Sequence, residues 1–175
     1  MVRQLTNKIE LTEEQKQILY GALLGDGSLI LHKHCKNAIF SYTSKSKQHV
    51  EYVSIPFKKY WSGEGIKQCT YYDGRTNKEY SRYVMRTYTN ETFTNEYHKW
   101  YKNGIKEIPK DLKLTPLICK IWYIGDGGIC RSNKSECIKL STQCFSKEEQ
   151  EEILLPQLSQ FEAILMNADK SKNGE

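Results

Sequence analysis

Apolar positions along the 175-residue chain change spacing several times, and each change predicts an element. Over residues 13–25 apolar side chains recur every three or four positions, which predicts a helix. The preceding residue, Thr12, has a hydroxyl that suits the N-cap of this helix. Over residues 28–43 the apolar positions form two short runs separated by a polar stretch, which predicts a β-hairpin. A second helix is predicted over residues 46–61, bent or divided at Pro56.

The rest of the chain continues and then repeats this order of elements. A second hairpin is predicted over 66–88 and a third helix over 91–102. Pro116 suits the first turn of a further apolar helix, which is followed by hairpin candidates and by a helix that begins at Ser146. The second unit is expected to be incomplete, because the chain stops within what would be its second hairpin. The predicted organisation is a first unit at 11–103, a linker at 104–115 and a second unit at 116–175.

A short phrase occurs twice at the same place in each unit. Residues 23–29 (LLGDGSL) and 123–129 (YIGDGGI) are apolar runs that end in an aspartate between two glycines. Two equivalent elements would therefore each deliver one carboxylate, Asp26 and Asp126. Gly21 lies one helical turn before the glycine that precedes Asp26, and small residues at this spacing let another helix approach closely.

Two carboxylates at the ends of closely packed helices suit a hard divalent cation. Mg²⁺ or Mn²⁺ takes carboxylate and water ligands and leaves room for phosphate oxygens. The alternative is that Asp26 and Asp126 are turn residues that end their helices, as such aspartates often do in ordinary loops. Their occurrence as a pair, each before a predicted hairpin, favours a functional site.

Composition permits a nucleic-acid partner without requiring one. The net charge is +5, from 26 Lys and Arg against 21 Asp and Glu. Tyrosines are interleaved with basic residues, as in Tyr80-Ser81-Arg82-Tyr83, and this pattern fits either half-buried strands or a nucleic-acid surface. The six cysteines form no zinc-binding spacing and are expected to be free, small buried residues in a reducing compartment. No signal segment or membrane span is indicated, so a soluble, intracellular protein is expected.

Residues 19–27 (LYGALLGDG) and 119–127 (CKIWYIGDG) resemble the paired motifs of the single-chain LAGLIDADG homing endonucleases, and the order of elements is similar too. The resemblance implies an α+β saddle of two pseudo-symmetric αββαββα units, with the motif helices at the centre and antiparallel sheets that form a concave DNA-binding face. It also implies that Asp26 and Asp126, with Gly25 and Gly125 beside them, form the divalent-metal site, each aspartate serving the hydrolysis of one DNA strand.

The resemblance implies further catalytic residues next to the first hairpin of each unit. Members of the family place a basic or polar residue there, and Lys45 has this position in the first unit, where a surface lysine at a helix start is the alternative. The second unit has Phe145 instead, so Gln143 is the nearest polar substitute and the two half-sites are not expected to be equivalent. Ile121 replaces the Gly21 of the first motif, which makes the helix packing less symmetric.

DNA contacts are expected from the hairpins, where alternating side chains reach base edges and basic residues hold phosphates. For the charged members, a solvated surface position is the alternative. The candidates are His32, Lys33, Lys36, Asn37, Ser41, Gln68, Arg75, Arg82, Arg86, Arg131, Lys134 and Lys139.

The sequence thus predicts a Mg²⁺-dependent endonuclease that cuts double-stranded DNA at a specific site and acts as a monomer if the second unit pairs with the first. The alternative is an RNA-binding maturase on the same fold that assists intron splicing without cleavage, which an incomplete second unit would favour. A degenerate product that folds poorly is a third possibility.

Overall fold

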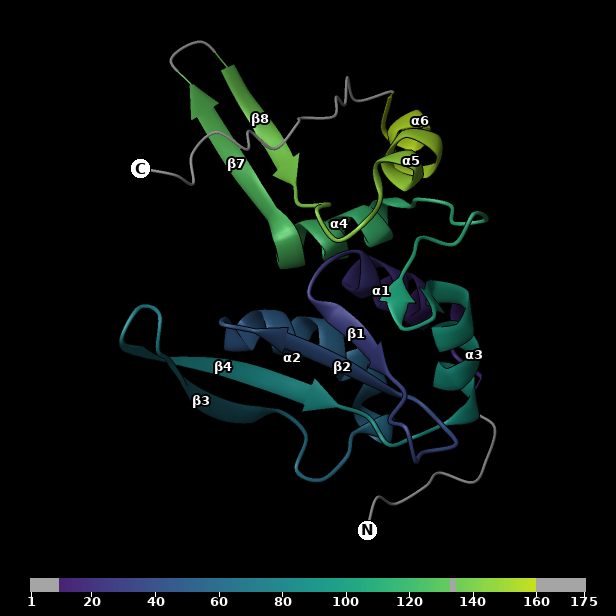
Figure 1. Ribbon diagram of the computed structural model, residues 1–175, viewed down its shortest axis with the longest axis vertical. Coiled ribbons are helices and arrows are strands. Elements are labelled where there is room, and N and C mark those ends of the chain that lie inside the picture. Colours follow the sequence, from purple (N-terminus) through teal and green to yellow (C-terminus); the bar gives the residue numbers. More distant parts are fainter. Residues whose placement is uncertain (1–9, 133–134, 160–175) are drawn as a thin grey trace.

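The first unit of the computed structural model follows the predicted order of elements (Figure 1). The structure describes residues 10–132 and 135–159. The elements of the first unit are α1 (Glu13–Leu24), β1 (Gly27–Ile30), β2 (Ile39–Ser44), α2 (Lys47–Ser54), the 3₁₀ helix η1 (Ile55–Tyr60), β3 (Lys67–Asp73), β4 (Lys78–Arg86) and α3 (Glu91–Trp100).

Local sequence explains where these helices begin and end. The Thr12 hydroxyl accepts a hydrogen bond from the Gln15 N–H, and the Gln15 side chain accepts one from the Thr12 N–H, which completes a capping box. At the start of α2 the Ser46 hydroxyl accepts a hydrogen bond from the His49 N–H. Pro56 cannot donate a backbone hydrogen bond, and the predicted division of this helix at Pro56 is confirmed, since η1 replaces the α-helix there.

The four strands of the first unit form one antiparallel sheet in the order β1-β2-β4-β3. Its buried face carries Phe40, whose ring lies 5.2 Å from that of Phe57 on η1 and 6.3 Å from that of Phe93 on α3. All three rings are fully buried. This aromatic contact joins η1 and α3 to the sheet.

The second unit begins with α4 (Pro116–Asp126), which lies over α1 at the centre of the molecule (Figure 1). A Cβ atom built on Gly21 would lie 2.6 Å from the Ile118 carbonyl oxygen and 2.7 Å from the Ile121 Cβ. One turn later, a Cβ on Gly25 would lie 3.5 Å from the Gly125 Cα. The predicted close approach of the two motif helices is therefore confirmed. Ile121 is fully buried against Gly21. The two motifs therefore differ at this position, and the large side chain of one fills the space left by the glycine of the other.

The remaining elements of the second unit are β7 (Gly127–Ser132), β8 (Ser135–Leu140), α5 (Lys147–Glu149), the π-helical turn η2 (Gln150–Leu154) and α6 (Leu155–Leu158). The predicted hairpin is confirmed, with β7 and β8 antiparallel. Ile129 pairs with Ile138 in the register in which Leu29 pairs with Phe40, but these isoleucines are 55% and 70% exposed whereas Leu29 and Phe40 are 2% and 0% exposed. Residues 160–175 lie outside the described residues, so the incomplete second unit stays a prediction.

The segment predicted as a linker is packed against both units. It contains β6 (Ile105–Lys106), which pairs with β5 (Tyr101–Lys102), and its side chains Ile108 and Leu112 are buried. The Glu149 carboxylate at the end of α5 accepts a hydrogen bond from the Ile108 N–H. This segment therefore holds the second unit in place and brings the residues of β6 under the motif helices.

Two further expectations concern the cysteines and the membrane. All six cysteines are free, but the prediction that they are buried is wrong, since four are exposed and two are half-buried. The exposed ones lie on β3, on the β7–β8 hairpin and in the loop after it. None of the helices in the described ranges has the length and apolar character needed to cross a bilayer.

Candidate active site at the ends of the two central helices

The close approach of α1 and α4 brings the two repeated phrases together. Asp126 is the last residue of α4, and Asp26 follows the C-cap residue Gly25 of α1. A Cβ atom on Gly125 would lie 3.2 Å from the Asp26 backbone nitrogen, so only glycine permits this contact without a shift of the chain. The glycines of the two motifs thus let the backbones meet, and the two aspartates interact electrostatically across this contact.

Both carboxyl groups are harder to ionise than free aspartates. Loss of surrounding water and the charge of Asp126 raise the pKa of Asp26 from its ordinary 3.8 to about 6. Loss of water also raises the pKa of Asp126. Lys106 lowers both pKa values, and His49 lowers that of Asp26. The site is therefore a pair of like charges that a bound cation would stabilise.

Lys106 is a fixed positive charge at this site that the sequence did not reveal. Its Nζ donates hydrogen bonds to the carbonyl oxygens of Leu23 and Gly27, at 2.9 Å each, and so ties β6 to both sides of the first motif turn. Burial lowers the pKa of Lys106, while the nearby Cys144, Asp126 and Asp26 raise it. Lys106 lies in the segment predicted as a linker, and no periodicity or motif there indicates a functional residue.

Tyr42 presents a buried hydroxyl to the same place. The residue lies on β2 opposite Gly27, and its side chain is fully buried. Its hydroxyl oxygen would lie 3.6 Å from a Cβ atom on Gly125. Within the described residues this hydroxyl has no hydrogen-bond partner. Loss of water, Asp26 and Asp126 all raise the pKa of Tyr42, so the phenol stays protonated.

The two predicted catalytic partners are both exposed, and neither contacts the aspartates within the described residues. Lys45 is exposed, and its Nζ lies 5.6 Å from the ring centroid of Tyr80 on β4. Gln143 is exposed as well, whereas Phe145 is 5% exposed within the core, which explains why the second unit has no lysine there. Catalytic roles for Lys45 and Gln143 stay predictions.

Most of the predicted DNA-contacting residues are exposed, on or beside the hairpins. The Arg82 guanidinium lies over the Tyr71 ring at 5.1 Å, and Tyr71 is stacked on Tyr80. Ser41 is 5% exposed inside the sheet, and burial there leaves it little access to DNA. Lys134 lies outside the described residues. The exposed members are His32, Lys33, Lys36, Gln68, Arg75, Arg82, Arg86, Arg131 and Lys139, and Asn37 is half-buried.

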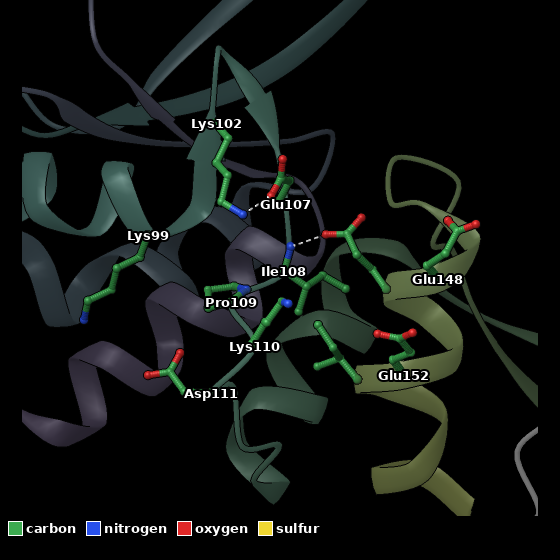
Figure 2. Close-up of a pocket in the computed structure, with 11 residues that line it drawn as sticks. Lys99, Lys102, Glu107, Ile108, Pro109, Lys110, Asp111, Glu148 and Glu152 are labelled. Atoms are coloured by element: carbon green, nitrogen blue, oxygen red, sulfur yellow. Dashed lines mark hydrogen bonds and ion pairs between the residues drawn. The ribbon is translucent and has the colours of Figure 1, made fainter.

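A cavity of about 390 Å³ lies elsewhere, between the packed linker and α5–η2 (Figure 2). Figure 2 shows charged side chains of both signs around it, including the ion pair of Lys102 with Glu107 at 2.6 Å. Neither aspartate of the repeated phrases lines it. Charged and apolar side chains together line this space between two packed segments, and Asp26 and Asp126 lie outside it.

Removal of the Asp26 charge should stabilise the metal-free protein. Between pH 4 and pH 6 the folded state keeps a proton on Asp26 that the unfolded state has lost, so stability falls as pH rises through this window. Asp26→Asn removes that cost, about 1 kcal/mol once the exposure of the side chain is allowed for, or about 2–4 °C in Tm. Thermal unfolding of both proteins in EDTA should show this gain at pH 7.5 and no gain at pH 4. An equal gain at both pH values would contradict the assigned pKa.

The sequence of this chain is similar to those of known proteins. The model of the LAGLIDADG DNA endonuclease family matches residues 16–162. The DNA endonuclease I-ChuI of Chlamydomonas applanata is 30% identical over 151 residues, which cover 79% of this chain and 69% of that protein. The cytochrome b mRNA maturase bI2 of Debaryomyces hansenii is 28% identical over 82% of this chain, and the match spans 55% of the maturase.

A solved structure shows the same fold. The homing endonuclease I-WcaI bound to its DNA recognition sequence superposes with a TM-score of 0.77 and 25% sequence identity. The match covers 86% of this chain and 68% of that one. The chain thus spans between about half and two thirds of these proteins.

Proposed function

The chain belongs to the LAGLIDADG DNA endonuclease family, and we propose that it hydrolyses both strands of double-stranded DNA at a specific site, with divalent metal bound by Asp26 and Asp126. The observation that carries this proposal is the contact between Gly25 and Gly125, which brings one carboxylate from each motif to a shared centre. The expected α+β fold with pseudo-symmetric motif helices agrees with the fold of the DNA-bound neighbour.

The residues at this centre fit a divalent cation. Two carboxylates are hard oxygen donors, and loss of water raises the pKa of both, so a bound cation would favour their ionised forms. Because Gly25 and Gly125 carry no side chains, the two motif turns meet through their backbones, and the two aspartates lie beside this contact. Mg²⁺ suits such a site, because it retains water ligands and accepts phosphate oxygens, and Mn²⁺ has similar requirements. When bound, the metal supplies Lewis-acid stabilisation of the phosphate and a more acidic water.

The protein's own residues would hold and orient these groups. Lys106 keeps the first motif turn in place through two carbonyl oxygens and brings a positive charge next to the aspartates. A cation fixed in this way can offset the negative charge that develops on a scissile phosphate. We further propose that the exposed side chains of Lys45 and Gln143 approach the DNA backbone or the attacking water when DNA is bound.

The exposed face of the four-stranded sheet is the proposed DNA-binding surface of the first unit. It carries Arg82 and Arg86 on β4, next to the exposed strand β3. Arginines on strands can read base edges in the major groove or hold phosphates. The β7–β8 hairpin presents Arg131 and Lys139 in the second unit. Because both motifs lie in one chain, we propose that the protein acts as a monomer.

Lys106→Met should disturb the site more than the same substitution at an exposed neighbouring lysine. Loss of the ammonium leaves the carbonyl oxygens of Leu23 and Gly27 without their donor and removes the charge that lowers the pKa values of the aspartates. We expect cleavage to fall about 100-fold and the acid limb of its pH profile to move to higher pH. Lys102→Met is the matched control, because Lys102 is paired with Glu107 at the protein surface. An unchanged pH profile in Lys106→Met would contradict this role.

The proposed function is tested by cleavage of DNA that spans the insertion site of the gene, and of a randomised DNA library, with Mg²⁺ and with EDTA. We expect a double-strand break within one short sequence that requires the metal. The maturase relative gives a second candidate, an RNA-binding splicing factor without cleavage activity. Tight binding of the host intron RNA with stimulated splicing, and no DNA cleavage in either assay, would favour that candidate instead.

A further inference from the structure

The buried hydroxyl of Tyr42 is a polar atom at the active site to which no role is yet assigned. Its ring is held on β2, between Gly27 of β1 and Met85 of β4, and has no exposure to solvent. Its oxygen lies against the Gly125 turn, within the electrostatic reach of both Asp26 and Asp126. No residue of the described ranges makes a hydrogen bond with it.

A tyrosine in such a position is unfavourable unless its hydroxyl has a partner in the functional state. A buried hydroxyl without a hydrogen bond costs free energy relative to a phenylalanine, which would fill the same apolar space. The ring is rigid and fully packed, so the hydroxyl cannot turn away to solvent. A hydrogen-bond partner would have to lie beside Gly125, where the two motif turns meet.

The second unit has no hydroxyl at the matching strand position. Tyr42 is paired with Gly27, and the residue paired with Gly127 in the same register is Leu140. The same strand position thus carries an O–H group in one unit and a purely apolar side chain in the other. The two units therefore differ chemically at this strand position, beside a centre that receives a carboxylate from each unit.

We propose that Tyr42 is a positioning residue of the metal centre, whose hydroxyl donates a hydrogen bond to an oxygen ligand of the cation held between Asp26 and Asp126. This inference rests on the proposed function, because it requires the metal site. The hydroxyl orients that ligand from the protein side, and groups that orient the ligands of a metal contribute to its affinity. The partner is identified by its chemistry, a water or carboxylate oxygen next to a divalent cation.

The test measures Mn²⁺ binding to the full chain by electron paramagnetic resonance of the free ion, together with Tm in EDTA. Tyr42→Phe removes one oxygen and keeps the packed ring. We expect its Mn²⁺ affinity to fall about 3- to 10-fold, while its Tm in EDTA stays equal to that of the wild type or rises. Tyr60→Phe, at a second buried tyrosine of the first unit, is the matched control and should bind Mn²⁺ like the wild type.

Each outcome separates this inference from the proposed function. If Tyr42→Phe binds Mn²⁺ as tightly as the wild type while Asp26→Asn binds it weakly, the role of Tyr42 is overturned and the metal site stands. If the affinity falls but Tm in EDTA falls as well, the hydroxyl serves the fold and the inference is again overturned. If the wild type and an Asp26→Asn/Asp126→Asn variant bind Mn²⁺ equally, the metal site itself fails, and the role of Tyr42 fails with it.

Discussion

Asp26→Asn should reduce DNA cleavage about a thousandfold while DNA binding stays within about threefold of the wild type. A metal ion contributes several kcal/mol to stabilisation of a phosphoryl transition state, and about 4 kcal/mol corresponds to three orders of magnitude in rate. Asparagine keeps the shape of the side chain but removes the negative charge, so the site loses metal affinity while the fold is preserved. The stability gain expected for the same variant above pH 6 makes unfolding an unsuitable explanation for lost activity.

The effects of the two aspartates on cleavage of the two DNA strands can be measured separately. Cleavage of a substrate labelled on each strand, under single-turnover conditions, reports the two rates for Asp26→Asn and for Asp126→Asn. Asp73→Asn is the control, because Asp73 lies at the end of β3 next to the hairpin turn, where it contacts Arg75. Full cleavage of both strands by both motif variants would contradict the assignment of Asp26 and Asp126.

Gly21→Ala should destabilise the protein by about 2 kcal/mol, or about 4–8 °C in Tm. Alanine is favoured over glycine in a helix by about 1 kcal/mol, so an exposed site would gain stability. At Gly21 the new methyl group would instead lie 2.6 Å from the Ile118 carbonyl oxygen and 2.7 Å from the Ile121 Cβ. The two central helices must then move apart. Overpacking of this kind costs about 1–3 kcal/mol after the gain in helix propensity is subtracted. Because the same helices position both aspartates, cleavage should fall as well.

A double-mutant cycle separates this clash from other effects of the substitution. Ile121→Ala creates space over residue 21 and should recover part of the lost stability in the Gly21→Ala background, although the contact with the Ile118 carbonyl remains. Gly74→Ala, in a hairpin turn where an added Cβ meets no atom within 4 Å, should change Tm by less than about 2 °C. Additive effects of Gly21→Ala and Ile121→Ala would show that the helices do not pack at this point.

Much of the fold could be predicted because local signals are strong in this chain. Thr12, Ser46 and Ser146 each stand at a helix start and cap it as expected. The hairpins follow from the change of apolar spacing, and the repeated Gly-Asp-Gly phrase identified the central helices and their carboxylates. These features depend on residues close together in the sequence, which a single chain reveals directly.

The remainder depends on contacts between distant segments. Lys106 reaches the carbonyl oxygens of Leu23 and Gly27 across about 80 residues, and nothing in its own neighbourhood indicates this. The Tyr42 hydroxyl, which has no hydrogen-bond partner among residues 10–132 and 135–159, is recognised only when β2 is placed against α4. Phe145 was noted as a missing lysine, whereas the structure shows it as a core residue. Sequence spacing therefore located the carboxylates, and tertiary packing revealed the groups around them.

The central claim is that one divalent-metal centre lies between the two motif turns, and iron-directed cleavage of the polypeptide tests it most directly. Fe²⁺ bound in place of Mg²⁺, with ascorbate and peroxide, cuts the backbone near the ion, and the fragments are mapped by mass spectrometry. We expect cuts close to Asp26 and close to Asp126 in the same protein, both suppressed by excess Mg²⁺ and absent from the Asp26→Asn/Asp126→Asn variant. Cuts confined to other segments, or cuts at the motifs that persist in that variant, would contradict the claim.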